Sequence, residues 1–236
     1  MSKKDFSVHT TAIIVAAGSC TRMNGINKQL LELDGVPVIV RTLKAFEGSP
    51  KISRIILVTR KESIVTLQNL ADKYMIYKLT DICEGGSDRH SSVLCGMERL
   101  TADEKKVLIQ DGARPFCTAQ MIADAAEALK NHDGSLCAVK ISDTIKLAAS
   151  DGTVTGTLDR SMLYSAQTPQ GVDVDLYKAA SAKSEDRSGF TDDASVLESA
   201  GHTVKLVEGS SSNIKITTRD DIPLAEAILR RLSSCE

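Results

Sequence analysis

The sequence predicts an α/β protein, with a doubly wound, mostly parallel sheet from which a β-hairpin arm protrudes. Three observations support this prediction. Short β-branched runs recur along the chain, amphipathic helical patterns separate them, and the alternation breaks once, between about residues 143 and 170. Such alternation is typical of parallel strands that are covered on both faces by crossover helices. The four runs are Ala12–Val15, Ile55–Thr59, Val107–Gln110 and Leu136–Val139.

Helical patterns lie between these runs and at the end of the chain. Within Met121–Leu129 the apolar residues fall on one face at helical spacing. A final helix is expected after Thr217 or Thr218, because either side chain can cap it. Asp220 and Asp221 would then lie in its first turn, where negative charge is favourable.

The segment 143–170 breaks the pattern. It holds two strand-like runs joined by Ser150-Asp151-Gly152, and Asp-Gly between such runs is a hairpin signal. A long hairpin that leaves a doubly wound domain exposes strand edges and apolar surface. We therefore expect this arm to lie against a second copy of the chain, at the interface of a homodimer.

Length and composition indicate a single domain, residues 1–236, that binds a small partner. Charged residues make up 25% with a net charge of -2, which excludes the basic excess typical of proteins that hold long nucleic acid. The N-terminus lacks the apolar stretch of a signal peptide, and no run reaches the roughly 18 to 20 apolar residues of a membrane span. We therefore expect a cytoplasmic protein whose six cysteines are reduced.

The loop after the first run has the residue types of a nucleotide site. Ala16-Ala17-Gly18 stands where parallel α/β sheets bind ligands, and such small residues let the backbone approach a nucleotide closely. Arg22 and Lys28 supply positive charge for phosphates. The spelling of the loop matches neither the Walker A motif nor the dinucleotide fingerprint. An ordinary surface turn with two solvated cations is the alternative.

Two further polar segments occupy other loop positions. Glu84–Ser92 has a Gly-Gly turn that frees backbone groups to read a base edge; the alternative is a plain turn capped by Ser91 or Ser92. Asp111 falls at the carboxyl end of a central strand, where a carboxylate costs free energy unless it is paired or meets a ligand. A simple pair between Asp111 and Arg114 is the alternative there.

Taken together, these motifs closely resemble the 2-C-methyl-D-erythritol 4-phosphate cytidylyltransferase family, in order and over nearly the whole chain. The resemblance implies a Rossmann-like nucleotidyltransferase fold. The stretches that carry it are Ala16-Ala17-Gly18, Arg22-Met23, Lys28-Gln29, Gly85-Gly86, Arg89, Ser92-Val93, Asp111-Gly112-Ala113-Arg114-Pro115, Asp143-Thr144-Ile145-Lys146, Asp159-Arg160, Gln167-Thr168-Pro169-Gln170, Thr191-Asp192 and Asn213-Ile214-Lys215.

The resemblance implies a reaction of the non-mevalonate isoprenoid pathway, in which CTP and methylerythritol 4-phosphate give a CDP-linked polyol and pyrophosphate. It also implies Mg²⁺ held mainly by the CTP phosphates, with no metal site of protein ligands. The nucleophile is a phosphate monoester whose second pKa is near 6, so it is largely dianionic at neutral pH and needs no general base. The catalytic work is to hold two anions in line and to stabilise the charge that develops.

The resemblance also implies roles for particular residues. Those similar to the cytidine and ribose contacts are Ala16, Ala17, Gly18, Gly86, Ser87 and Ser92, and those similar to the triphosphate clamp are Arg22 and Lys28. Those similar to the polyol phosphate site are Asp111, Arg114, Thr144, Arg160, Thr168 and Lys215. Among all of these the expected catalytic charges are Arg22, Lys28, Arg160 and Lys215. Some of the polyol contacts would come from the partner's arm.

Alternatives stay open for residues and for function. Lys215 could be an outward lysine on an edge strand, and Arg160 could form a salt bridge with Asp159 within the arm. Ribitol 5-phosphate cytidylyltransferase is the near alternative function. A non-catalytic nucleotide-binding or scaffolding protein is the alternative from a different class.

Overall fold

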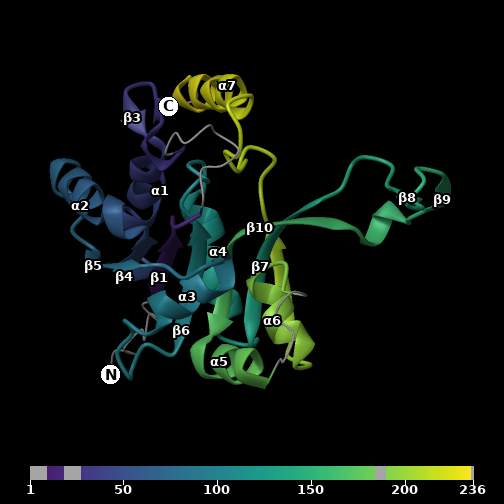
Figure 1. Cartoon of the computed structure of the whole chain (residues 1–236), viewed down its shortest axis with the longest axis horizontal. Helices are drawn as coiled ribbons and strands as arrows, with labels where there is room; N and C mark the ends of the chain where they lie inside the picture. Colours follow the sequence, from purple (N-terminus) through teal and green to yellow (C-terminus); the bar gives the residue numbers. More distant parts are fainter. Residues whose placement is uncertain (1–9, 19–27, 184–189, 235–236) are drawn as a thin grey trace, which may run out of the picture.

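The four expected strands and three further ones assemble into one seven-stranded sheet in a computed structural model, which describes residues 10–18, 28–183 and 190–234. The strands are β1 (Thr10–Val15), β4 (Ile52–Thr59), β5 (Leu79–Glu84), β6 (Lys106–Asp111), β7 (Gly134–Lys140), β10 (Tyr164–Asp173) and β11 (Val204–Glu208). Their order across the sheet is β11-β7-β10-β6-β1-β4-β5 (Figure 1). Only β10 runs antiparallel to its neighbours in this sheet, which confirms the mostly parallel prediction.

Helices cover both faces of the sheet, as expected. On one face lie α1 (Val38–Glu47), α2 (Ile64–Lys73), which follows the short helix η3 (Lys61–Ser63), and α4 (Ala119–Ala128). On the other lie α3 (Arg89–Met97), α5 (Val174–Lys183) and α6 (Asp193–Ser199). The successive β1 residues Ile13 and Ile14 enter opposite cores, and each is fully buried, which contributes about 1.5–3 kcal/mol per side chain. None of the helices in the described ranges is long and apolar enough to cross a membrane.

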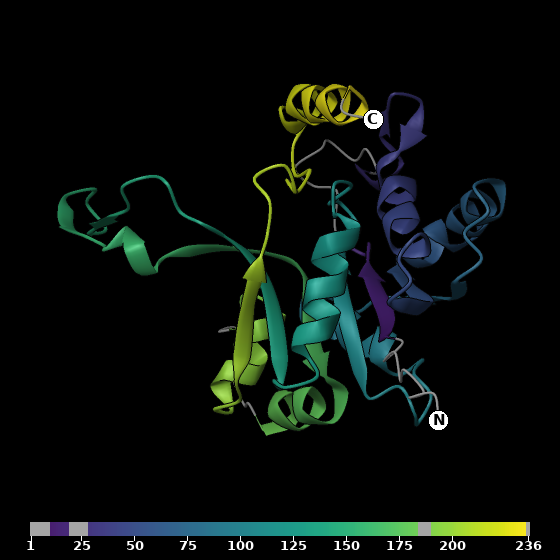
Figure 2. The same cartoon turned by 180° about the vertical axis from the view of Figure 1, so that it is seen from behind.

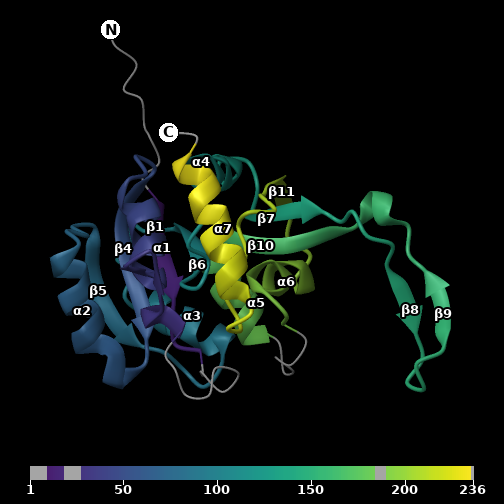
Figure 3. The ribbon, with the colours of Figure 1, turned by 90° about the horizontal axis from the view of Figure 1, so that it is seen from above.

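The hairpin arm extends from the sheet between β7 and β10 (Figures 1 and 3). It contains β8 (Lys146–Ala148), β9 (Val154–Thr157) and the short helix η4 (Arg160–Met162). The turn lies at the expected Asp-Gly pair, where Gly152 has a φ of 84° and the Asp151 carboxylate accepts a hydrogen bond from Thr153 N at 2.9 Å. The arm ends earlier than expected, because β10 begins at Tyr164 and its residues 167–172 are buried between β6 and β7.

The last helix, α7 (Asp221–Ser233), lies across one end of the molecule (Figure 2). It packs against the small hairpin of β2 (Glu32–Leu33) and β3 (Val36–Pro37) through a separate apolar cluster. The expected threonine cap is wrong. The residue before the helix, Asp220, forms no capping hydrogen bond, and the Asp221 carboxylate instead accepts hydrogen bonds from Thr217 N (2.7 Å) and Thr218 N (2.8 Å). These amides precede the helix, and the Thr217 hydroxyl donates to the same carboxylate oxygen at 2.9 Å, so the threonines act here as donors and not as the acceptors that a cap requires.

Candidate functional site

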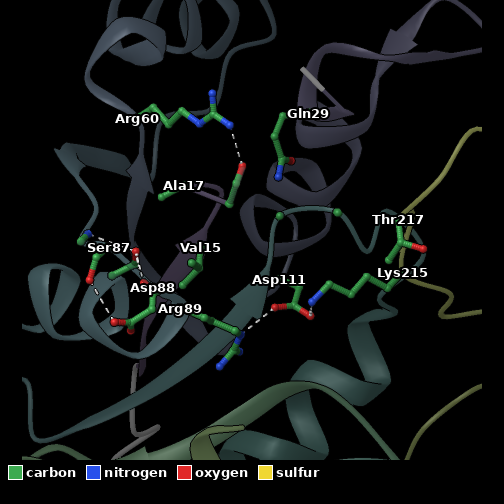
Figure 4. A pocket seen from close by; sticks show the side chains of 15 residues that line it. Val15, Ala17, Gln29, Arg60, Ser87, Asp88, Arg89, Asp111, Lys215 and Thr217 are labelled. Atoms are coloured by element: carbon green, nitrogen blue, oxygen red, sulfur yellow. Dashed lines mark hydrogen bonds and ion pairs between the residues drawn. The ribbon is translucent and has the colours of Figure 1, made fainter. Parts of the chain in front are cut away.

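A pocket opens at the carboxyl ends of β1 and β6 and has a volume of about 430 Å³. After β1 the chain crosses to β4 on one side, and after β6 it crosses to β7 on the other. Ligands of doubly wound sheets bind at such a topological switch point. The fold therefore places the pocket where the sequence predicted the ligand (Figure 4).

Small residues form one wall of this pocket. Gly85 permits the close approach, because a Cβ there would lie 2.5 Å from Ala17 Cβ and 2.7 Å from Ser92 Oγ. Ser92 Oγ accepts a hydrogen bond from Gly86 N at 3.1 Å and donates to Asp88 O at 2.7 Å. The Gly-Gly turn is thus fixed against α3, and Gly18, which also lines the pocket, is exposed.

The N-terminus of α3 also lines the pocket. Its cap is Asp88, not the expected Ser91 or Ser92, because a reciprocal capping box joins Asp88 and Ser91. Asp88 Oδ1 accepts from Ser91 N at 2.7 Å, and this hydrogen bond lowers the pKa of Asp88. A helix N-terminus with free backbone amides and a positive dipole end is favourable for binding anions.

A cationic cluster surrounds Asp111 on the floor of the pocket. Lys215 Nζ lies 2.8 Å from Asp111 Oδ2, Arg89 Nε lies 3.1 Å from Oδ1, and Arg114 Nε lies 3.4 Å from Oδ2. Burial works to raise the pKa of Asp111, but these cations outweigh burial and hold the pKa below its ordinary value. The simple Asp111–Arg114 pair is therefore only one part of a larger cluster.

Seven of the expected site residues line the pocket, and three more support it from behind. The lining ones are Ala17, Gly18, Gly86, Ser87, Ser92, Asp111 and Lys215. Ala16 is 5% exposed, and its N–H donates to Val58 O at 2.7 Å. Arg114 donates to Asn213 O at 2.7 Å, while Thr168 Oγ1 accepts from Asp111 N at 3.1 Å.

Of the remaining four expected residues, two lie on the arm and do not line the pocket of their own chain, and two have side chains outside the described part. Thr144 and Arg160 belong to the arm, where Arg160 Nη1 donates to Ser142 O at 2.7 Å. Arg22 lies outside the described residues. Lys28 begins the short helix η2 (Lys28–Leu30), but its side chain lies outside the described part. Its neighbour Gln29 lines the pocket.

Among the lining residues to which sequence reasoning assigned no role are Arg89, Arg60 and Gln29. Arg89 belonged to a motif, but its contact with Asp111 required the tertiary structure. Arg60 follows β4, and its Nη2 donates to Gly18 O at 3.2 Å. The rule that ligands lie beyond strand ends could have identified Arg60. Gln29 stood beside an expected phosphate ligand, and nothing in its own pattern indicated a function.

Within the described ranges there is no group of three or more histidine, cysteine or carboxylate side chains arranged to hold a metal ion. The two carboxylates that line the pocket already have partners. Asp88 caps α3, and Asp111 forms ion pairs with three cations. Neither is arranged as part of a dedicated cation site.

The doubly wound sheet, the small-residue wall and the cationic pocket at the switch point define a nucleotide-binding α/β protein. The model of the family described as 2-C-methyl-D-erythritol 4-phosphate cytidylyltransferase matches residues 10–231. The chain therefore belongs to this family, as the resemblance implied.

Individual relatives agree with this assignment. The chain is 45% identical over 227 residues to the 2-C-methyl-D-erythritol 4-phosphate cytidylyltransferase of Clostridium novyi, covering 95% of this chain and 98% of the relative. A crystal structure of 4-diphosphocytidyl-2C-methyl-D-erythritol synthase from Anaerococcus prevotii matches with a TM-score of 0.84 and 33% identity, over 95% and 97% of the two chains. The enzyme from Thermus thermophilus matches with a TM-score of 0.75 and 27% identity, over 94% and 99%.

Proposed function

We propose that the pocket above β1 and β6 is where this chain transfers a cytidylyl group from CTP to 2-C-methyl-D-erythritol 4-phosphate. The activity itself follows from membership in the family and is a step of isoprenoid precursor synthesis by the non-mevalonate route. One observation carries the assignment to this pocket: the cationic cluster on Asp111 lies beside the small-residue wall at the switch point.

The small-residue wall is the nucleotide half of the proposed site. Ala17 and Gly18 present backbone groups from the end of β1, and Gly86 and Ser87 present them from the turn before α3. Backbone N–H and C=O groups fixed in this way can discriminate bases, because a mismatched exocyclic group leaves buried polar groups unpaired. Cytidine and ribose bind here in our proposal. Arg22 and Lys28 then contact the triphosphate.

The cationic cluster is the polyol phosphate half. Asp111 accepts from the polyol hydroxyls, and Lys215 attracts the phosphate. Arg160 and Thr144 lie on an exposed arm that projects from the sheet, so we propose that they complete the site of a second subunit in a homodimer. The dimer, and a cytoplasmic location, are predictions from the sequence.

Catalysis in this proposal consists of placement and charge stabilisation. The phosphate oxygen of the polyol attacks the α-phosphate of CTP, the bond to the β-phosphate breaks, and pyrophosphate leaves. Aligned reactants gain from proximity, and donors aimed at the developing charge stabilise the transition state. Lys28 and Arg22 are the proposed donors at the triphosphate, while Lys215 orients the attacking anion.

Mg²⁺ is the proposed metal, held mainly by the phosphates of CTP. The paired state of Asp88 and Asp111 supports this arrangement, because the pocket offers no unpaired carboxylate cage among its described lining residues. Mg²⁺ is commonly bound by substrate phosphates with one or two carboxylates and water. When bound, it would neutralise charge on the triphosphate.

The direct test is pyrophosphate release by the purified chain with CTP and Mg²⁺, using methylerythritol 4-phosphate and ribitol 5-phosphate in separate reactions. We expect release with the first polyol and much less with the second. UTP should replace CTP poorly at low concentration. Turnover with ribitol 5-phosphate alone would instead establish the alternative function, and no turnover with either would contradict both.

A variant pair tests whether the reaction uses this pocket. Lys215→Ala should raise the KM for the polyol phosphate, because it removes the ammonium group that attracts the phosphate in our proposal. This group lies 2.8 Å from Asp111 Oδ2. The control is Lys205→Ala, which removes an exposed lysine from the edge strand β11. Equal kinetic constants in the two variants would place the polyol phosphate elsewhere.

A further inference from the structure

A buried acidic residue behind the pocket forms a second anchor for the cationic cluster. Asp193, the first residue of α6, is 1% exposed and does not line the pocket. Its Oδ2 lies 2.7 Å from Arg89 Nη2. Its Oδ1 accepts a hydrogen bond from the Tyr177 hydroxyl at 3.2 Å. Both oxygens are therefore engaged, and one of them holds a guanidinium that reaches the pocket.

The Arg89 guanidinium is held between two carboxylates. Its Nε donates to Asp111 and its Nη2 to Asp193, so two nitrogens of the planar group bind different acids. Burial works to lower the pKa of Arg89, but Asp193 and Asp111 outweigh it and raise the pKa, which keeps the group charged. The guanidinium cannot rotate without losing one of these charge-assisted hydrogen bonds.

This arrangement leaves one oxygen of Asp111 for the other cations. Oδ1 accepts from Arg89, whereas Oδ2 faces Lys215 and Arg114. Arginine prefers to bind a carboxylate through two parallel hydrogen bonds when nothing else holds it. A freed Arg89 would therefore compete for Oδ2 and displace Lys215.

We propose that Asp193 is a positioning residue for the polyol phosphate: it holds Arg89 so that Asp111 keeps one oxygen for Lys215. This inference rests on the proposed function, because Lys215 is assigned there to the phosphate. The charges agree with it. Arg89, Arg114 and Lys215 supply three positive charges, and Asp111 and Asp193 supply two negative ones, which leaves one positive charge for an anionic substrate.

Tyr177, which donates to Asp193, is itself held by a neighbouring side chain on α3. The Tyr177 hydroxyl lies 3.0 Å from His90 Nδ1, and His90 Nε2 lies 2.7 Å from Ser181 Oγ. Tyr177 is fully buried on α5. The position of Asp193 is thus fixed by two helices, α5 and α6, that contribute no lining residue to the pocket.

The test is Asp193→Asn, which removes the charge and keeps the shape. We expect the KM for the polyol phosphate to rise about 10-fold, the loss of affinity typical when one hydrogen bond to a charged group is weakened. The KM for CTP should stay within about twofold, because the small-residue wall is untouched. The control is Glu104→Gln, which removes an acid that pairs with Arg54 at the same 2.7 Å but lies away from this pocket.

A double variant separates positioning from folding. Arg89→Gln alone leaves Asp193 buried without its cation, which is destabilising, so Arg89→Gln with Asp193→Asn should have the higher Tm. The two should share one KM for the polyol phosphate, because Asp193 acts only through Arg89. A further increase in KM from Asp193→Asn in the Arg89→Gln background would overturn the inference. The inference would also be overturned if Asp193→Asn raised the KM for the polyol phosphate no more than Glu104→Gln does. Normal turnover by the wild type would in that case leave the proposed function intact.

Discussion

At the scale of single residues, charge and burial are balanced most closely at Asp111. The residue is 6% exposed at the end of a central strand, where an isolated carboxylate would be costly. Three cations contact it, and Thr168 Oγ1 accepts from its backbone N–H. The sequence predicted that this carboxylate needed a partner but not that Arg89 and Lys215, from distant segments, would provide two of them.

Asp111 should make stability depend on acid pH. Its pKa in the folded protein lies below the unfolded value of about 3.9, so its contribution to stability is complete above that value and is lost as the pH falls through the folded pKa. In urea unfolding, the free energy of unfolding of the wild type should therefore fall more steeply between pH 5 and pH 2 than that of Asp111→Asn. Equal pH dependence in both proteins would show that the ion pairs of Asp111 do not make the free energy of unfolding depend on pH.

The triphosphate clamp is a second prediction at this scale. Arg22→Ala or Lys28→Ala should lower kcat about 100- to 1000-fold, the usual loss of about 2.7–4 kcal/mol for one charge-stabilising contact. Stability should change little, and thermal unfolding checks this. The control Lys105→Ala removes an exposed lysine paired with Asp175 and should keep normal kcat. Near-normal turnover in both variants would contradict the assignment of Arg22 and Lys28 to the triphosphate.

At the scale of elements, α3 links the core to the site. Its N-terminal turn lines the pocket, and its glycine, Gly96, packs directly on the sheet. A Cβ at Gly96 would lie 2.6 Å from Ile13 Cγ2 and 2.9 Å from Val58 Cγ2. These methyl groups belong to buried β-branched residues of β1 and β4. The helix can therefore approach the strands this closely only if residue 96 is glycine.

Gly96→Ala should destabilise the fold. The clash costs about 1–3 kcal/mol, against which the higher helix propensity of alanine returns about 1 kcal/mol. Urea unfolding should show a lower midpoint with an unchanged m-value. Gly48→Ala is the control, since Gly48 has a φ of -73° and its nearest atom lies 3.4 Å from the added Cβ. An equal midpoint for the two variants would show that α3 moves freely away from the sheet.

At the scale of the whole molecule, the arm is the feature that a single chain leaves unexplained. Its exposed apolar side chains include Leu147, Val154 and Met162, at 47%, 60% and 80%. Arg160, also on the arm, is an expected phosphate ligand that does not line the pocket of its own chain. Both facts support a dimer in which each arm reaches the other subunit.

Mixing variants tests that dimer. Arg160→Ala should raise the KM for the polyol phosphate with CTP binding nearly intact, because arginine binds phosphate through two charge-assisted hydrogen bonds. Combining Arg160→Ala subunits with Lys28→Ala subunits should restore part of the activity, since one site of each mixed dimer then has both native groups. Mixed dimers that form without recovery, or a fully active monomer in size measurements, would contradict a shared site.

Local patterns in the sequence were sufficient to predict the alternation of strands and helices, the hairpin turn and the family. Those features depend on local periodicity, on the backbone freedom of Gly152 and on ordered motifs, all of which are properties of the chain before it folds. These patterns did not predict that β10 is a central strand, because segment 164–170 was assigned to the arm. The central position of β10 follows only from its pairing with both β6 and β7 in the folded chain.

Only the tertiary structure decided which charges meet. Asp111, Arg89, Lys215 and Asp193 are separated by up to 126 residues (from Arg89 to Lys215), yet they form one continuous set of ion pairs. Nothing in local spacing specifies such contacts, because they depend on strand order, on the depth of α3 against the sheet and on the path of the chain after β11. The sequence therefore predicted that cations and a carboxylate would gather at one edge, and the fold decided which oxygen each cation faces.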